Sequence, residues 1–287
     1  MEPRARHLKG ADGLELRLYE WSETGTTLLL LHGFGNDAHV WDSLAPRLAP
    51  HYRTLALDLR GHGHSDWDPE QRYDHASMAR DVERVLDQLG AGRVVLVGHS
   101  LGGRVGMRFA GLAPERMAGF VIVDSGPDLD LRGVSRIREE AATEASHFTS
   151  VRQYEELLAR NYPATAPATL VELARHWLRE RPEGGFEPTM DPALRRGLAS
   201  AEHGEDARLS LEREAQTLWA ALERLPCPAL LVRGAASDVL SADVADAMEA
   251  RIPNARLVVV PRAGHSVMLD NPEAFEAAVL GFVLGED

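Results

Sequence analysis

The chain has 287 residues, of which 44% are hydrophobic and 26% are charged, and its formal net charge at pH 7 is −13. This composition is typical of a globular protein with a sizeable buried core, and the negative charge disfavours nucleic acid and anionic lipid as partners. A single cysteine, Cys227, excludes an internal disulfide and any multi-cysteine metal site.

The first elements in chain order predict a hairpin and then an alternation of strands and helices. Leucines alternate with charged residues over 14–18, after the turn-forming "GADG", which predicts a half-exposed strand of a hairpin. The next apolar runs are short and nearly continuous, as in parallel strands covered on both faces; they occupy 27–32, 53–59, 94–98 and 119–124. Apolar residues at three- and four-residue spacing predict helices between them, over 40–48, 78–89 and 101–112.

The pattern changes after Asp124. Residues 127–225 are polar and helix-rich, with no apolar run of the earlier kind. The strand pattern then resumes at 228–234 and 255–261, and a helix over 272–284 follows. We therefore expect one α/β core, formed by 1–126 and 226–287, whose mostly parallel sheet is interrupted by an inserted subdomain over 127–225.

The stretch "VVLVGHSLGG" contains the most informative motif. Gly98-His99-Ser100-Leu101-Gly102 fits G-x-S-x-G, at a point where a buried strand runs into an amphipathic helix. Small neighbours permit the tight turn that exposes the hydroxyl, and the free N–H groups of the helix start point at the same place. Ser100 is therefore the candidate nucleophile, and an ordinary helix-capping serine is the alternative interpretation.

A serine hydroxyl needs a base and an orienting carboxylate. His265 lies after the last predicted strand, where open α/β sheets place their sites, so it is the candidate base among twelve histidines. Asp238 follows the penultimate strand and is our preferred acid; Asp124, at the end of "FVIVD", is the second candidate. His62 and His64 have no third ligand type nearby, so we expect no metal site.

The oxyanion of an acyl-transfer reaction needs two backbone donors. Leu101, directly after the serine, is expected to supply one, and Phe34 in the glycine-rich "HGFG" loop the other. A plain tight turn is the alternative interpretation of that loop.

Five motifs together resemble the α/β-hydrolase fold superfamily: "LLLLHGFGNDAHVW", "LALDLRGHGHSD", "VVLVGHSLGG", "LLVRGAASDVLS" and "VVVPRAGHSVMLDNPEAF". The resemblance extends from about residue 14 to 284. It does not cover 127–225, which is where the superfamily carries its helical cap. It implies an eight-stranded, mostly parallel sheet with an inserted cap, a triad of Ser100, Asp238 and His265, an oxyanion hole at Phe34 and Leu101, and no cofactor.

The predicted activity is the cleavage of small carboxylic esters through an acyl-enzyme. Lactone, thioester, amide and carbon–carbon bond hydrolysis on the same triad remain alternatives, as does a non-catalytic ligand-binding or receptor protein. The chain shows no signal peptide and no apolar run of the ~18 residues of a membrane helix, so we expect a cytoplasmic location without membrane partners. The sequence carries no signal for an oligomeric state.

Overall fold

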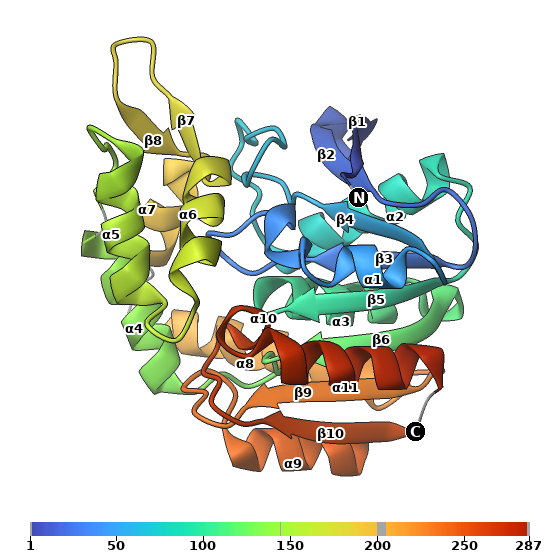
Figure 1. The fold of residues 1–287 in the computed structure, drawn as a ribbon. Coiled ribbons are helices and arrows are strands. Elements are labelled where there is room, and N and C mark those ends of the chain that lie inside the picture. Colours follow the sequence, from blue (N-terminus) through green and yellow to red (C-terminus); the bar gives the residue numbers. More distant parts are fainter. Residues whose placement is uncertain (1, 144, 200–204, 286–287) are drawn as a thin grey trace.

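The fold is built on one twisted eight-stranded sheet (Figure 1). The structure is a computed structural model that describes residues 2–143, 145–199 and 205–285. The strand order is β1-β2-β4-β3-β5-β6-β9-β10, with antiparallel pairing of β1 with β2 and of β2 with β4, and parallel pairing elsewhere. The strands are β1 (Arg4–Lys9), β2 (Glu15–Glu20), β3 (Thr27–Leu31), β4 (Arg53–Leu57), β5 (Val94–His99), β6 (Met117–Val123), β9 (Ala229–Gly234) and β10 (Ala255–Val260).

This architecture confirms the expected α/β class, the N-terminal hairpin and the mostly parallel sheet. The central strands are apolar throughout because both faces are covered by helices. Alternate leucines of β3 point to opposite faces: Leu29 and Leu31 belong to one hydrophobic cluster, and Leu28 and Leu30 belong to the other. Both faces of the same strand are therefore core, which explains its lack of an alternating pattern.

The helices that cover these two faces come from before, within and after the insertion. The first cluster includes residues of α2 (His75–Gln88), α3 (Leu101–Leu112), α8 (Glu205–Leu222) and α9 (Ala242–Arg251). The second includes residues of η2 (Ala38–Trp41), α1 (Ala45–Leu48), α10 (Val267–Asp270) and α11 (Pro272–Leu284). Two further short 3-10 turns are η1 (Ala11–Gly13) and η3 (Pro114–Arg116).

The predicted helix over 40–48 is wrong in part. The structure has two short turns there, η2 and α1, instead of one continuous helix. Pro46 stands at the start of α1, and a proline inside a helix lacks the N–H donor and clashes with the carbonyl four residues earlier. The apolar residues therefore keep a helical spacing across Pro46, although the backbone cannot continue as one helix there.

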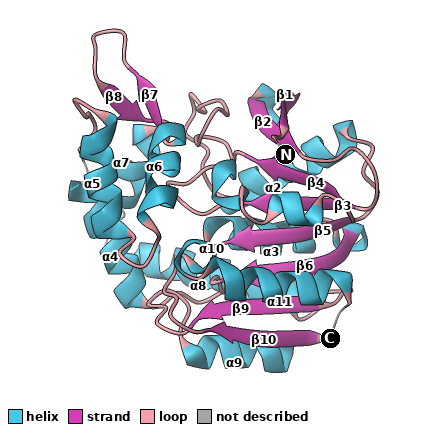
Figure 2. Ribbon diagram, in the orientation of Figure 1, coloured by secondary structure: helices cyan, strands magenta, loops and turns pink. Residues whose placement is uncertain are grey.

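A helix-rich insertion lies between β6 and β9, as expected (Figure 2). It contains α4 (Leu131–Thr143), α5 (Val151–Asn161), α6 (Pro167–His176), α7 (Pro192–Ala199) and α8. Two short antiparallel strands, β7 (Leu178–Glu180) and β8 (Phe186–Pro188), also occur there, and the apolar-run criterion missed them because they are short and partly exposed.

Most of the insertion, from α4 to α7, gathers at one end of the sheet, on the left in Figure 1. Its last helix, α8, packs against α3 and contributes Leu218 and Leu222 to the core. The division of the chain at 126/127 and 225/226 therefore stays a prediction about domains. No described helix is long and apolar enough to cross a membrane.

Candidate active site

Ser100 occupies a sharp turn between β5 and α3. Its φ of 50° and ψ of −111° are unusual for a residue with a side chain. The Ser125 hydroxyl donates a hydrogen bond to the Ser100 carbonyl at 2.7 Å, which supports the turn. The two motif glycines are sterically required, since a Cβ would lie 2.5 Å from the Gly102 carbonyl oxygen at Gly98 and 2.4 Å from the Leu31 carbonyl oxygen at Gly102.

A substitution at this turn should be costly to stability. In Gly102→Ala the new methyl group would overlap backbone atoms that cannot move aside, so we expect a loss of at least ~2 kcal/mol of unfolding free energy. Gly92→Ala is the matched control, because nothing lies within 4 Å of its Cβ position, and its effect should stay within about 0.5 kcal/mol. Urea unfolding measures both; equal stability of the two variants would contradict the steric account.

His265 reaches Ser100 from the loop between β10 and α10. Its Nε2 lies 2.9 Å from the Ser100 Oγ, so the predicted pair of nucleophile and base is brought together. His99 donates from Nε2 to the His265 carbonyl at 2.9 Å, and the Gly264 N–H donates to Asp270 Oδ2 at 2.8 Å. These two contacts hold the backbone of the histidine loop on both sides.

The sequence analysis did not predict that His99 supports the His265 loop. The only signal for this role was the position of His99 next to Ser100 in the motif. Burial, with the nearby His265 second, lowers the pKa of His99 to about 3. A histidine that stays neutral in this way can act as a steady hydrogen-bond donor without adding charge beside the nucleophile.

The carboxylate that contacts His265 in the structure belongs to Asp124, the second candidate, and not to the preferred Asp238; which acid acts in catalysis stays a prediction. Asp124 Oδ2 lies 2.8 Å from His265 Nδ1, and its side chain is completely buried. The Gly234 N–H donates to its Oδ1 at 3.0 Å and the Ser237 hydroxyl to its Oδ2 at 2.5 Å. Three donors thus orient this carboxylate.

Asp238 is held by a different partner. Arg136 of α4 donates to both of its oxygens, at 2.6 Å from Nε and 3.0 Å from Nη2. The hydrogen bond and charge of Arg136 lower the pKa of Asp238 below its usual value. A bidentate arginine engages both carboxylate oxygens, so the Asp238 carboxylate faces Arg136. Asp238 nevertheless lines the cavity beside the serine.

The two predicted oxyanion donors both lie near Ser100, Leu101 as the next residue in the chain and Phe34 in the folded structure. Leu101 is the first residue of α3, and Phe34 lines the same cavity as Ser100 and His265. Within the described part of the chain, neither of these two N–H groups donates a hydrogen bond to another protein group. Both are therefore available to a substrate oxygen.

The cavity over Ser100 measures about 490 Å³ and lies between the sheet end and the insertion. Three aromatic residues of the insertion, Tyr154, Tyr162 and Trp177, line it. Trp219 instead donates from Nε1 to Asp128 and stacks under Arg251, and Phe148 packs on Tyr154. The insertion thus contributes walls to the cavity as well as packing.

The glycine-rich loops around the cavity are tied together by buried polar groups. Asp58 accepts from the N–H groups of Ala38 and His64 and so links these two loops. Burial and the nearby Asp37 raise its pKa to about 7. His32 accepts from the Leu59 N–H at 2.9 Å. Burial lowers the pKa of His62 to about 4, so this histidine is a neutral part of the core.

A protein-family model described as the alpha/beta hydrolase fold matches residues 26–272. The chain belongs to the alpha/beta hydrolase fold family. The match extends across the serine turn, the two carboxylates and the histidine loop, and it includes the insertion.

Several similar proteins are hydrolases. A 2-(acetamidomethylene)succinate hydrolase of Mesorhizobium japonicum is 30% identical over 91% of this chain and 88% of its own length. A pimeloyl-[acyl-carrier protein] methyl ester esterase of Nitrosomonas europaea is 33% identical over 89% of this chain and 95% of its own. A crystal structure of E-2-(acetamidomethylene)succinate hydrolase superposes with a TM-score of 0.84 at 26% identity, covering 98% and 99% of the two chains. This α/β hydrolase is thus similar to enzymes with different substrates.

Proposed function

We propose that this α/β hydrolase cleaves small carboxylic esters with Ser100 as nucleophile, His265 as base and Asp124 as the orienting acid. The observation that carries the proposal is the continuous chain of contacts from Ser100 Oγ through His265 to Asp124, with distances of 2.9 Å and 2.8 Å. Both distances fall within normal hydrogen-bond range, and this arrangement is the one that serine acyl transfer requires.

In the first half-reaction, Ser100 Oγ attacks the ester carbonyl carbon while His265 Nε2 takes the hydroxyl proton. Asp124 keeps the Nδ1 proton of the imidazole in place and stabilises the imidazolium that forms. The N–H groups of Phe34 and Leu101 donate to the oxyanion. Collapse of the tetrahedral intermediate breaks the bond to the alkoxy group, which leaves as the alcohol after receiving the proton from His265.

In the second half-reaction, water attacks the acyl-serine. His265 takes a proton from that water, and the same oxyanion donors act again. The carboxylic acid leaves when Ser100 Oγ recovers its proton. No bond in this sequence requires an oxidant or a cofactor, because protons and electron pairs balance between ester, water and histidine.

A small acyl substrate is supported by the size of the cavity, about 490 Å³, which lies within the range of small-molecule sites. The similarity to a methyl ester esterase supports ester chemistry. Apolar walls such as Ile137, Leu158 and Met190 favour an acyl chain over a strongly hydrated group.

Hydrolysis of an acetamido-substituted acid is a second candidate. It is favoured by the 30% identity to a 2-(acetamidomethylene)succinate hydrolase and by the arginines Arg136, Arg160 and Arg195 in the cavity wall. Guanidinium groups favour substrates that carry a carboxylate. Arg136 is already bonded to Asp238 and Glu140, which weakens its attraction for a further anion.

A panel of p-nitrophenyl esters of increasing acyl length tests the proposal, together with an acetamido acid, a lactone and a thioester. We expect turnover of the short and medium esters, with kcat/KM falling once the acyl chain outgrows the cavity. Preference for the acetamido acid would favour the second candidate instead. Absence of both turnover and fluorophosphonate labelling would favour a ligand-binding protein.

A further inference from the structure

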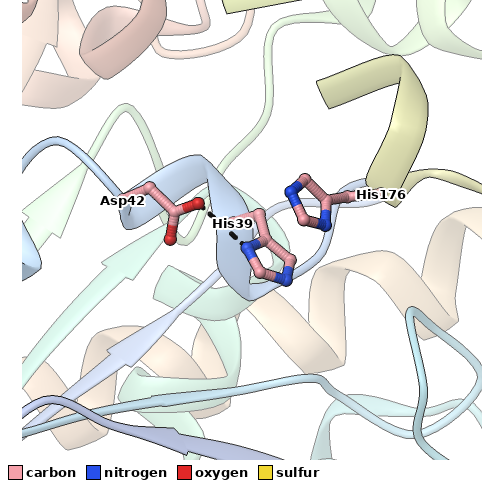
Figure 3. Close-up of side chains that lie close together, drawn as sticks. All are labelled: His39, Asp42 and His176. Carbon is pink, nitrogen blue, oxygen red and sulfur yellow. Dashed lines mark hydrogen bonds and ion pairs between the residues drawn. The ribbon is translucent and has the colours of Figure 1, made fainter. Parts of the chain in front are cut away.

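Three side chains with metal-binding atoms meet at the junction of the core and the insertion (Figure 3). His39 belongs to η2 of the core, Asp42 follows that turn, and His176 ends α6 of the insertion. Each offers one ligand atom, and these atoms lie within 4.8 Å of one another. We propose that His39, Asp42 and His176 bind one divalent transition-metal ion that links the insertion to the core.

The three ligand atoms lie near one another, and the two imidazole rings are stacked. His39 Nδ1 lies 2.9 Å from Asp42 Oδ2, and the two imidazole rings stack with centroids 3.5 Å apart and an interplanar angle of 15°. Ligand atoms around a tetrahedral zinc ion, at about 2.0–2.1 Å from the metal, are ~3.3 Å apart. An imidazole nitrogen binds a metal in the plane of its own ring. The His176 ring must therefore turn out of the stack, and Asp42 must release His39 Nδ1, before all three atoms bind one ion.

The side chains also leave room for an ion to enter. The Asp42 side chain is 47% exposed, and His176 is half-buried, so both can rotate and water can complete the coordination shell. Two imidazoles and one carboxylate suit Zn²⁺, Ni²⁺ and Cu²⁺, whereas Mg²⁺ prefers oxygen ligands and strict octahedral geometry. This donor set defines the chemical class of the ion.

Buried hydrogen bonds already hold η2 of the core next to the end of α6 in the insertion. Trp177, which follows His176, donates from Nε1 to Asp37 Oδ1 at 3.0 Å. The same oxygen accepts from the His39 N–H at 2.9 Å and caps η2. The backbones that carry the two histidines are thus positioned before a metal binds, which reduces the entropy cost of binding.

Binding of Zn²⁺ to chelator-treated protein tests the proposal. Isothermal titration calorimetry should give one high-affinity equivalent with a micromolar Kd, and Mg²⁺ should give no heat. At a free concentration of ~100 times Kd, the thermal midpoint should rise by about 5 °C.

His176→Ala and His39→Ala should each weaken Zn²⁺ binding at least ~10-fold and abolish the thermal shift. His51→Ala is the matched control, since His51 is exposed and lies outside the cluster, and it should bind as the unaltered protein does. Equal affinity of His176→Ala and the unaltered protein, or no zinc-induced shift, would overturn the site. These readouts do not use hydrolysis, so either result leaves the proposed esterase activity to be judged separately.

Discussion

Ser100→Ala is expected to lower kcat for ester hydrolysis by about 10⁴–10⁶, as for other serine triads. The substitution removes the only atom that forms the acyl-enzyme bond, while His265, Asp124 and the oxyanion donors stay in place. The residual rate should come from water attack aided by substrate binding and the oxyanion hole. Steady-state kinetics with p-nitrophenyl butyrate measures the change, and fluorophosphonate labelling should disappear with it.

Ser210→Ala provides a matched serine substitution, because Ser210 is exposed on α8. It should keep both the labelling and the rate. Retention of more than about a tenth of the activity by Ser100→Ala would refute Ser100 as the nucleophile.

Asp124→Asn is expected to lower kcat by about 10⁴, because an amide can no longer hold the Nδ1 proton of His265 and permits the wrong tautomer. Asp238→Asn should keep kcat within about tenfold, because it alters a carboxylate that faces Arg136 rather than His265. The comparison therefore separates two acidic residues that lie beside the same cavity.

Thermal unfolding of both variants serves as the control, since Asp124 also accepts from the Gly234 N–H and the Ser237 hydroxyl. A kinetic defect in Asp124→Asn should persist at temperatures well below its midpoint. The opposite pattern, a large loss in Asp238→Asn and a small one in Asp124→Asn, would restore Asp238 as the catalytic acid.

The two acids show why spacing along the chain was insufficient. Both follow a strand of the parallel sheet, and strands β6 and β9 are neighbours, so their carboxyl ends bring Asp124 and Asp238 to the same edge. Chain order favours Asp238, but in the structure Asp238 pairs with Arg136 and Asp124 contacts His265. Arg136 lies in the insertion, where the sequence carried no recognisable motif.

The proposed metal site also could not be predicted from spacing along the chain. His39 and Asp42 are near neighbours in the chain, yet two potential ligands at this spacing predict little. His176 comes from the insertion, and the neighbouring Trp177 donates a hydrogen bond to Asp37 of the core. Sequence inspection considered His62 and His64 instead, and the structure buries His62 in the core.

The sequence alone determined the sheet, the serine turn and the histidine loop, because these depend on local patterns: continuous apolar strands, glycines that only a tight turn requires, and a histidine placed after the last strand. The tertiary structure decided which acid orients His265, which aromatic residues line the cavity and which histidines meet across the junction. Those outcomes depend on contacts between residues far apart in the chain, and such contacts follow from packing and charge pairing that local spacing does not encode.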